Sequence, residues 1–326
     1  MKILWMLRTA CVGVTMLTAT QAVAAGAAGS YPSQPLRVIV PFSAGGGNDI
    51  VARLLAQHLN PVLNTTVVVE NRPGAGGNIG LRGAAMAPAD GYTVGYVSNG
   101  VVMNPYLYRD VGFDIASDFE PVAGLVTTPI WVLTHPNLKV ESMAQLLAKA
   151  KADPGGLTYA TPGVGTPHHL GAELLQAMAG VSMVHVPYKG ASGAATDVVG
   201  GQVDVLISTP ASVQGFVKSG QLRALASMAP QRSAEMPDLP VVAETLPGFG
   251  AGIWHGLVVP RGTDPAVIQT LSAAVERVLA DPGLQQSLLA AGFSAAYESP
   301  QDLRDRIARE LVMWRDVTSQ AGIKPE

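Results

Sequence analysis

The chain has 326 residues, of which 48% are hydrophobic and 14% are charged, and its formal net charge at pH 7 is −3. At this length one hydrophobic core usually stops growing, so we expect two domains with ample apolar material for both. The near-balanced charge, spread without basic clusters, disfavours a nucleic-acid partner, because neutralising phosphates requires clustered Lys and Arg.

The first 25 residues have the pattern of a secretory signal peptide. Lys2 and Arg8 precede an apolar run over residues 10–17, and Ala22 and Ala24 form a small-residue cleavage site. The apolar run is too short to span a bilayer. We therefore expect Sec-type export, removal of residues 1–25 by cleavage near Ala24, and a soluble mature protein in the periplasm.

Cysteine chemistry is not expected in the mature protein. The only cysteine, Cys11, lies inside the signal segment, and Arg8 stands three places before it, where a lipoprotein signal requires leucine. Lipid anchoring is therefore not expected. A mature chain without cysteine forms no disulfide and offers no thiolate to a metal or a substrate.

Beyond the leader, short apolar strands alternate with helical stretches, which is typical of α/β folds with parallel sheets built from βαβ units. The predicted strands cover residues 36–40, 66–69, 93–97, 130–133, 183–186, 203–207, 222–226 and 256–259. Helices are predicted after Asn48-Asp49, and after Asp264-Pro265, Asp281-Pro282 and Ser299-Pro300, where an N-cap residue precedes proline at the first helical position. The last third is expected to be mostly helical.

No flexible linker separates the two predicted domains, so ordered segments must connect them. The expected crossings lie near residues 128–131 and 253–255. Residues 31–128 and 256–326 would then form domain 1, and residues 129–255 would form domain 2. A ligand cleft with a two-segment hinge follows from this arrangement.

The loop Pro41-Phe42-Ser43-Ala44-Gly45-Gly46-Gly47-Asn48-Asp49 joins a strand to a helix. Its glycines allow close approach of a ligand, and the helix N-terminus favours negative charge. The loop also lies at the carboxyl end of a strand, where open α/β sheets bind ligands. An anion site and a plain tight turn are equally compatible with this motif.

A second glycine cluster, over residues 71–80, invites a dinucleotide-binding interpretation. The spacing excludes it, because Ile79 stands where the fingerprint requires glycine, and the chain has no P-loop. We expect this loop mainly to pack at the domain interface, with ligand contact as the alternative.

Two further turns, over residues 161–169 and 186–192, each join a strand to a helix in the predicted second domain. Their N–H groups and hydroxyls are candidates to hold a carboxylate from the side opposite the first loop, replacing its hydration without a buried arginine. Helix capping alone is the competing interpretation for each.

Catalytic and metal-binding signatures are not found in the sequence. His168 and His169 are adjacent and diverge, the other histidines are scattered, and neither G-x-S-x-G nor S-x-x-K occurs. We therefore expect no catalytic residue, no metal and no cofactor. Asp204 precedes an apolar strand and is expected either to make a structural pair or to contact Tyr188, Lys189 or a ligand amine.

Several motifs in order resemble the substrate-binding receptors of tripartite tricarboxylate transporters, the Bug-type proteins. They are Tyr31-Pro32-Ser33-Gln34-Pro35, the loop 41–49, Val69-Glu70-Asn71-Arg72-Pro73-Gly74-Ala75-Gly76-Gly77-Asn78, Asp90-Gly91-Tyr92-Thr93, Val186-Pro187-Tyr188-Lys189-Gly190 and Gly201-Gln202-Val203-Asp204. The resemblance covers essentially the whole mature chain.

The resemblance implies a type II periplasmic-binding-protein fold, in which two α/β domains close on a small carboxylate-bearing ligand. It also implies delivery of that ligand to integral-membrane transporter subunits or, in some members, to a sensor kinase; we expect a monomer without enzymatic activity. The ligand-binding residues carried over by matching positions are Phe42, Ser43, Ala44, Gly45, Gly46, Ser98, Asn99, Gly100, Gly165, Thr166, His168, Tyr188, Lys189, Gly190, Ala191, Ser192 and Asp204.

The sequence departs from this family at the loop after Lys189-Gly190. The family commonly has a proline there before the helix, whereas Gly193-Ala194-Ala195 follows Ser192 here. That loop contacts the variable end of the ligand, so the ligand's identity is left open among mono-acids, dicarboxylates, acidic amino acids and aromatic acids. A secreted enzyme acting on a carboxylate, using Asp204, His168 or Tyr188, is a remote alternative.

Overall fold

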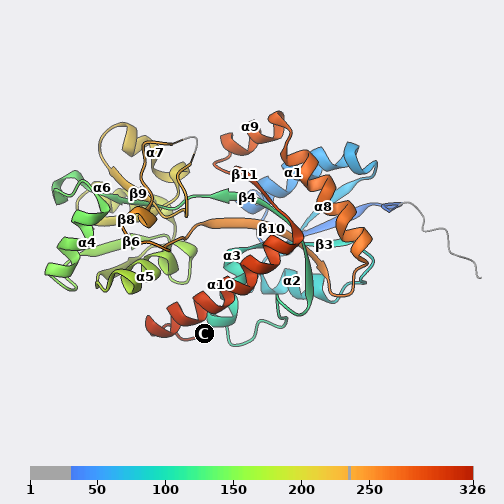
Figure 1. Ribbon diagram of the computed structural model, residues 1–326, viewed down its shortest axis with the longest axis horizontal. Coiled ribbons are helices and arrows are strands. Elements are labelled where there is room, and N and C mark those ends of the chain that lie inside the picture. The colour runs from blue at the N-terminus through green and yellow to red at the C-terminus, as the bar shows by residue number, and fades with distance from the viewer. Residues whose placement is uncertain (1–30, 234–235, 326) are drawn as a thin grey trace, which may run out of the picture.

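The computed structural model describes residues 31–233 and 236–325, and the predicted signal peptide lies outside these residues. Figure 1 shows two lobes side by side, each with helices packed around a sheet. The chain is therefore organised around two separate sheets, as the alternating sequence pattern predicted.

The first sheet has six strands in the order β11-β4-β10-β3-β1-β2. Its strands are β1 Leu36–Val40, β2 Val67–Asn71, β3 Thr93–Ser98, β4 Phe119–Thr128, β10 Ile253–Pro260 and β11 Ser294–Glu298. Strands β1, β2 and β3 are parallel, whereas β10 is antiparallel to β3 and β4, and β11 is antiparallel to β4. This sheet combines the two ends of the described chain.

The second sheet has five strands in the order β7-β6-β8-β5-β9. They are β5 Trp131–Thr134, β6 Thr158–Thr161, β7 Val184–Pro187, β8 Val205–Ser208 and β9 Arg223–Ser227. β6 is parallel to β7 and β8, and β5 is antiparallel to β8 and β9. The predicted parallel pairs are present, but antiparallel strands that the pattern did not indicate make both sheets mixed.

Helices cover the faces of both sheets. The α-helices are α1 Gly47–Leu63, α2 Asn78–Ala85, α3 Asn99–Met103, α4 Met143–Ala152, α5 Pro167–Ala179, α6 Ala191–Val199, α7 Pro210–Lys218, α8 Pro265–Leu279, α9 Pro282–Ala290 and α10 Pro300–Gln320. Short 3-10 turns are η1 Ala75–Gly77, η2 Asn104–Tyr106, η3 Pro136–Leu138 and η4 Val242–Glu244. In the described chain, no helix is both long and apolar enough to cross a membrane.

The predicted caps of the last three helices are confirmed. The side chains of Asp264, Asp281 and Ser299 accept hydrogen bonds from the first turns of α8, α9 and α10, and proline follows each cap. A side-chain oxygen at this position satisfies a backbone N–H that has no partner within the helix. These short local motifs therefore fix where the helices begin.

Two strands carry the chain between the lobes. β4 leads directly into β5, and β10 receives the chain returning from β9, so that Ile253 pairs with Thr128. Figure 1 shows β4 and β10 extending together from the first sheet toward the other lobe. The long α10 packs on β4 and also on α5 of the other lobe, so it bridges the same junction.

Candidate ligand-binding cleft

A cleft of about 470 Å³ opens between the two lobes. The carboxyl ends of β1, β3 and β6 all point toward it, as expected for ligand sites in open α/β sheets. Its lining consists of Phe42, Asn48, Gly76, Ser98, Asn99, Gly100, Asn104, Leu107, Tyr108, Val164, Gly165, Thr166, Pro167, Ile253, His255, Ile323 and Lys324. Both lobes therefore contribute to one shared space.

The structure gathers only part of the residue set expected from sequence. Six of those residues line the cleft: Phe42, Ser98, Asn99, Gly100, Gly165 and Thr166. The others stand outside its lining in this arrangement: Ser43, Ala44, Gly45, Gly46, His168, Tyr188, Lys189, Gly190, Ala191, Ser192 and Asp204.

The first glycine loop is held by an acidic side chain from the helix that it opens. Asp49 is 3% exposed, and its carboxylate accepts hydrogen bonds from the Gly45 N–H at 2.8 Å, from Arg53 Nε at 2.9 Å and from Asn71 Nδ2 at 2.9 Å. Burial alone would raise the pKa of Asp49, but these hydrogen bonds lower it below its usual value. The Gly45 N–H, expected to meet a ligand, is thus already occupied.

The second glycine loop, residues 71–80, packs against neighbouring residues of its own lobe, and its Gly76 lines the cleft. Asn104 Nδ2 donates to the Gly76 carbonyl at 3.0 Å and to Asn78 Oδ1 at 2.6 Å. A Cβ on Gly76 would lie 2.6 Å from the Tyr108 hydroxyl, and the φ of Gly76 is +63°. Only glycine fits at this contact. The loop therefore both packs within the protein and lines the cleft.

The loop before α5 forms the wall contributed by the second lobe. Thr166 caps α5 and donates to the Gly163 carbonyl at 2.7 Å, while the Gly165 N–H donates to His169 Nδ1 at 3.2 Å. The His169 ring stacks on His185 with centroids 4.1 Å apart, and burial lowers the pKa of His169 to about 4. A neutral ring is the form that accepts this bond, so the loop is held in place near neutral pH.

The neighbouring loop from Tyr188 to Ser192 is tied back onto its own lobe. The Tyr188 hydroxyl donates to Asp197 at 2.6 Å, and the Gly190 N–H donates to the Pro162 carbonyl at 3.0 Å. Burial, followed by the bond to Asp197, raises the pKa of Tyr188 to about 12. This loop therefore lies beside the cleft wall formed by the loop before α5.

Asp204 occupies the opposite end of its strand from the cleft. It immediately precedes β8, and its carboxylate accepts from the Thr158 N–H and hydroxyl, both at 2.9 Å. The cleft lining follows the other end of β6, after Thr161. Of the two roles expected for Asp204, the structure has the structural pair, formed here with Thr158. Asp204 contacts neither Tyr188 nor the cleft.

Asn99, one of the predicted residues, is tied to the crossing strand: its Nδ2 donates to the Gly252 carbonyl at 2.7 Å, just before β10. The cleft also contains residues that the sequence did not identify. His255 follows on β10, and its Nδ1 lies 2.5 Å from the Tyr96 hydroxyl. Lys324, which follows α10, is the charged side chain of the lining. An isolated histidine or lysine carries no spacing signal, so no motif marked His255 or Lys324.

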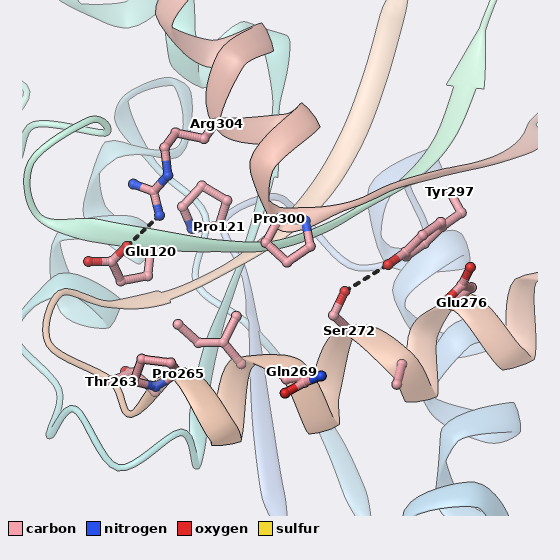
Figure 2. Close-up of a pocket in the computed structure, with 12 residues that line it drawn as sticks. Glu120, Pro121, Thr263, Pro265, Gln269, Ser272, Glu276, Tyr297, Pro300 and Arg304 are labelled. Carbon is pink, nitrogen blue, oxygen red and sulfur yellow. Dashed lines mark hydrogen bonds and ion pairs between the residues drawn. The ribbon is translucent and has the colours of Figure 1, made fainter.

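A second hollow, of about 530 Å³, lies within the first lobe (Figure 2). Figure 2 shows Arg304 reaching Glu120 on one side and Ser272 meeting Tyr297 on the other. Arg304 Nη2 lies 2.6 Å from Glu120 Oε2, and Ser272 Oγ lies 2.9 Å from the Tyr297 hydroxyl. Its lining comes only from β4, α8, β11, α10 and their connections. No strand-end loop from the other lobe reaches this hollow. The cleft between the lobes is therefore the better candidate for a ligand site.

Within residues 31–233 and 236–325, no cluster of three metal-ligating side chains occurs. The two mixed sheets, the paired crossing strands and the cleft between them define a two-domain binding protein with the type II periplasmic-binding fold.

Comparison with known proteins gives the family. Residues 51–323 match the family described as "Tripartite tricarboxylate transporter family receptor". The chain therefore belongs to this family of periplasmic solute-binding proteins. Protein BugT of Bordetella pertussis is 35% identical over 97% of this chain and 97% of its own length. The sequence resemblance to Bug-type receptors is thereby confirmed.

Solved structures agree with this assignment. R. palustris Rpa4515 with adipate is 32% identical, with a TM-score of 0.72 over 91% of this chain and 100% of that chain. MatC from Rhodopseudomonas palustris with bound malate is 28% identical, with a TM-score of 0.67 over 88% and 99%. A ligand-free TctC protein from Polaromonas is also 28% identical, with a TM-score of 0.82 over 89% and 99%.

Proposed function

We propose that this protein captures a small carboxylate-bearing ligand in the cleft between its lobes and delivers it to a tripartite tricarboxylate-type membrane transporter. The observation that carries the proposal is the shared lining, in which strand-end loops from both lobes meet around one space. Related proteins have been solved with adipate and with malate, which are both dicarboxylates.

We infer that the arrangement described here is the open one. At the same 28% identity, the chain is more similar to the ligand-free Polaromonas protein than to malate-bound MatC, with TM-scores of 0.82 and 0.67. Residues 31–128 with 256–326 form one moving domain in this proposal, and residues 129–255 form the other. Closure then brings the loop from Tyr188 to Ser192 toward the ligand.

Binding by mostly neutral groups fits the composition of the cleft. Apart from Lys324, the polar side chains of its lining are hydroxyls, amides and one imidazole. A carboxylate that leaves water needs several such donors to replace its hydration. Export of the receptor follows from the signal-peptide pattern, and the mature protein is expected to begin close to Ala25.

The test is a ligand screen on protein refolded to remove anything bound. Malate, succinate, adipate, citrate, acetate and benzoate are added separately, and thermal unfolding is followed. A ligand at 100 times its Kd stabilises the folded state by about 2.7 kcal/mol, which gives a clear rise in Tm. If none of these acids, nor any other carboxylate added in excess, raises the Tm, the proposal is wrong.

A further inference from the structure

His255 lies on β10 at the floor of the cleft. The residue is 4% exposed and lines the space between the lobes. Its ring sits between Tyr96, with centroids 5.4 Å apart, and Phe293, also at 5.4 Å. Two aromatic neighbours thus hold the imidazole ring in one orientation.

The hydrogen bond to Tyr96 determines which ring nitrogen carries the proton. Tyr96 is fully buried, and its hydroxyl lies 2.5 Å from His255 Nδ1, its one hydrogen-bond partner among the described residues. A buried hydroxyl must donate its proton, and Nδ1 is the available acceptor. This contact favours the tautomer in which Nδ1 accepts the bond and the neutral ring carries its proton on Nε2.

The other ring nitrogen remains available to a ligand. Among the described residues, His255 Nε2 has no hydrogen-bond partner, yet it is not sealed from solvent. His255 lines the cleft, and we infer that Nε2, the ring nitrogen not engaged by Tyr96, is the one it presents to that space. Burial lowers the pKa of His255 to about 3, so the ring is neutral near neutral pH. The cleft floor therefore presents a single N–H donor in a fixed direction.

We propose that His255 is a ligand-binding residue whose Nε2–H donates to an oxygen of the bound acid, and that Tyr96 is a positioning residue that fixes this tautomer. The inference rests on the proposed function of the cleft. It assigns to the crossing strand β10 a direct role in recognition, in addition to joining the two lobes.

A carboxylate oxygen is the acceptor that suits this donor. A hydrogen bond from a neutral N–H to a charged oxygen is stronger than one between neutral groups. A neutral donor adds no charge that must be desolvated when the lobes close, unlike an ammonium or guanidinium group. His255 would therefore complement the Ser98 hydroxyl and the second N–H of the Asn99 amide without a buried ion.

The first test compares binding by calorimetry, using whichever acid of the panel gives the largest thermal shift. His255→Phe removes the donor, and the expected loss of affinity is about 10- to 100-fold, the usual value for a hydrogen bond to a charged group. His255→Gln keeps an N–H donor and should lose less. His58→Asn, on α1 beside Asp281, is the matched control and should bind like the wild type.

The second test uses the unaltered protein and so does not depend on how the variants fold. Nitrogen NMR of protein labelled at the histidine rings reports which nitrogen is protonated, and His255→Phe identifies the signal. We expect Nε2 of His255 to be protonated without ligand and to shift when the acid is added. In Tyr96→Phe the tautomer preference should be lost, which a merely structural tyrosine would not cause.

The outcomes separate this inference from the function on which it rests. If an acid binds the wild type and His255→Phe equally well, and the Nε2 signal does not move, the role of His255 is disproved while the receptor function stands. A proton found on Nδ1 would disprove the role of Tyr96. If no acid binds the wild type, the proposed function itself fails.

Discussion

The indole Nε1 of Trp254 donates a hydrogen bond of 2.7 Å to Oε1 of Glu310, joining β10 to α10 where the chain crosses between the lobes. Trp314 Nε1 lies 3.5 Å from the other carboxylate oxygen, and Arg306 Nη1 lies 3.8 Å from the first. Burial raises the pKa of Glu310 from 4.5 to about 7, although these neighbours oppose the rise. The junction thus contains a carboxyl group that titrates near neutral pH.

The pKa of Glu310 predicts a pH-dependent stability. Because the folded state binds this proton more tightly than the unfolded state, its contribution is complete below the unfolded pKa of 4.5 and is lost as the pH rises through about 7. Between about pH 5 and pH 8, the free energy of unfolding of the wild type should fall by on the order of 3 kcal/mol relative to that of Glu310→Gln. Urea unfolding at several pH values measures this difference.

Glu310→Gln retains an acceptor for Trp254, so packing is preserved while the titration is removed. Glu276→Gln, at an exposed position on α8, is the control and should follow the wild type at every pH. If the free energies of unfolding of the wild type and Glu310→Gln differ by the same amount at every pH, the prediction is wrong.

Asp49 is predicted to stabilise the first glycine loop. In Asp49→Asn the charge-assisted bonds from Gly45 and Arg53 weaken, and a loss of about 2 kcal/mol in the free energy of unfolding is expected. Since the folded pKa of Asp49 is lowered, this advantage is present above its usual pKa of 3.8 and disappears as the pH falls through the folded value.

Asp305→Asn, at an exposed position on α10, is the matched control, because it also replaces a helical aspartate by its amide. Urea unfolding at neutral pH compares the two variants. Equal stabilities would mean that the loop is held mainly by its backbone turn and not by the carboxylate.

Local motifs predicted the elements that depend on few residues. The N-cap and proline pairs before α8, α9 and α10 each satisfy a helix end without help from distant parts of the chain. Strand β4 was not predicted, because Pro121 and Gly124 interrupt its pattern. Pro121 is tolerated because β11 pairs only with residues from Gly124 to Thr127, which leaves that side of β4 open.

Antiparallel pairing could not be foreseen from strand patterns. β10 pairs with β3 and β4 although many residues separate them, and the Ala-rich β11 has no strong strand signal of its own. Periodicity identifies a strand, whereas its neighbours depend on the path of the whole chain. Strand β6, Thr158–Thr161, was missed because its sequence Thr-Tyr-Ala-Thr is not an apolar run, whereas the equally short β5, β7 and β8 are mostly apolar and were predicted.

The candidate site was predictable where it lies in strand-end loops and unpredictable elsewhere. Phe42, Gly165 and Thr166 belong to turns whose glycines and position suggested a ligand. His255 and Lys324 reach the cleft from a crossing strand and from the segment after α10, and neither belongs to a motif. Conversely, the sequence could not reveal that the Gly45 N–H is occupied by Asp49.

Gly165 is predicted to be sensitive to substitution for two separable reasons. Its φ is +72°, and a Cβ there would lie 3.2 Å from Leu107 Cδ1, across the cleft on the other lobe. Gly201 has the same φ of +72° and no neighbour within 4 Å. Alanine at either position should cost about 1–2 kcal/mol of stability from the left-handed backbone alone.

The difference between the two alanine variants measures the contact with Leu107. Gly165→Ala should also weaken acid binding, because its Cβ displaces the wall of the cleft, whereas Gly201→Ala should bind like the wild type. Calorimetry with the best acid of the panel and thermal unfolding together test this. Equal affinities for the two variants would show that the contact between lobes does not influence the site.

Lys324 is predicted to favour ligands with a second carboxylate. It is the charged side chain among the lining residues, and the segment that carries it is anchored where Arg109 Nε donates to the Pro325 carbonyl at 3.4 Å. The family match ends at residue 323, so this cation lies beyond the part of the chain that the family description covers. Lys324→Gln should weaken adipate or malate binding by about 2- to 5-fold, the effect typical of an exposed ion pair.

Three comparisons distinguish a specific charge effect from a general one. Monocarboxylates such as acetate should bind Lys324→Gln almost as well as the wild type, because in the proposed binding mode a single carboxylate is held by the neutral donors of the cleft. Lys151→Gln, on the distant α4, should leave every affinity unchanged. The dicarboxylate effect should shrink at high salt, since the ammonium group is exposed and its field is screened. A loss that is equal for mono- and dicarboxylates would instead assign Lys324 to the shape of the cleft.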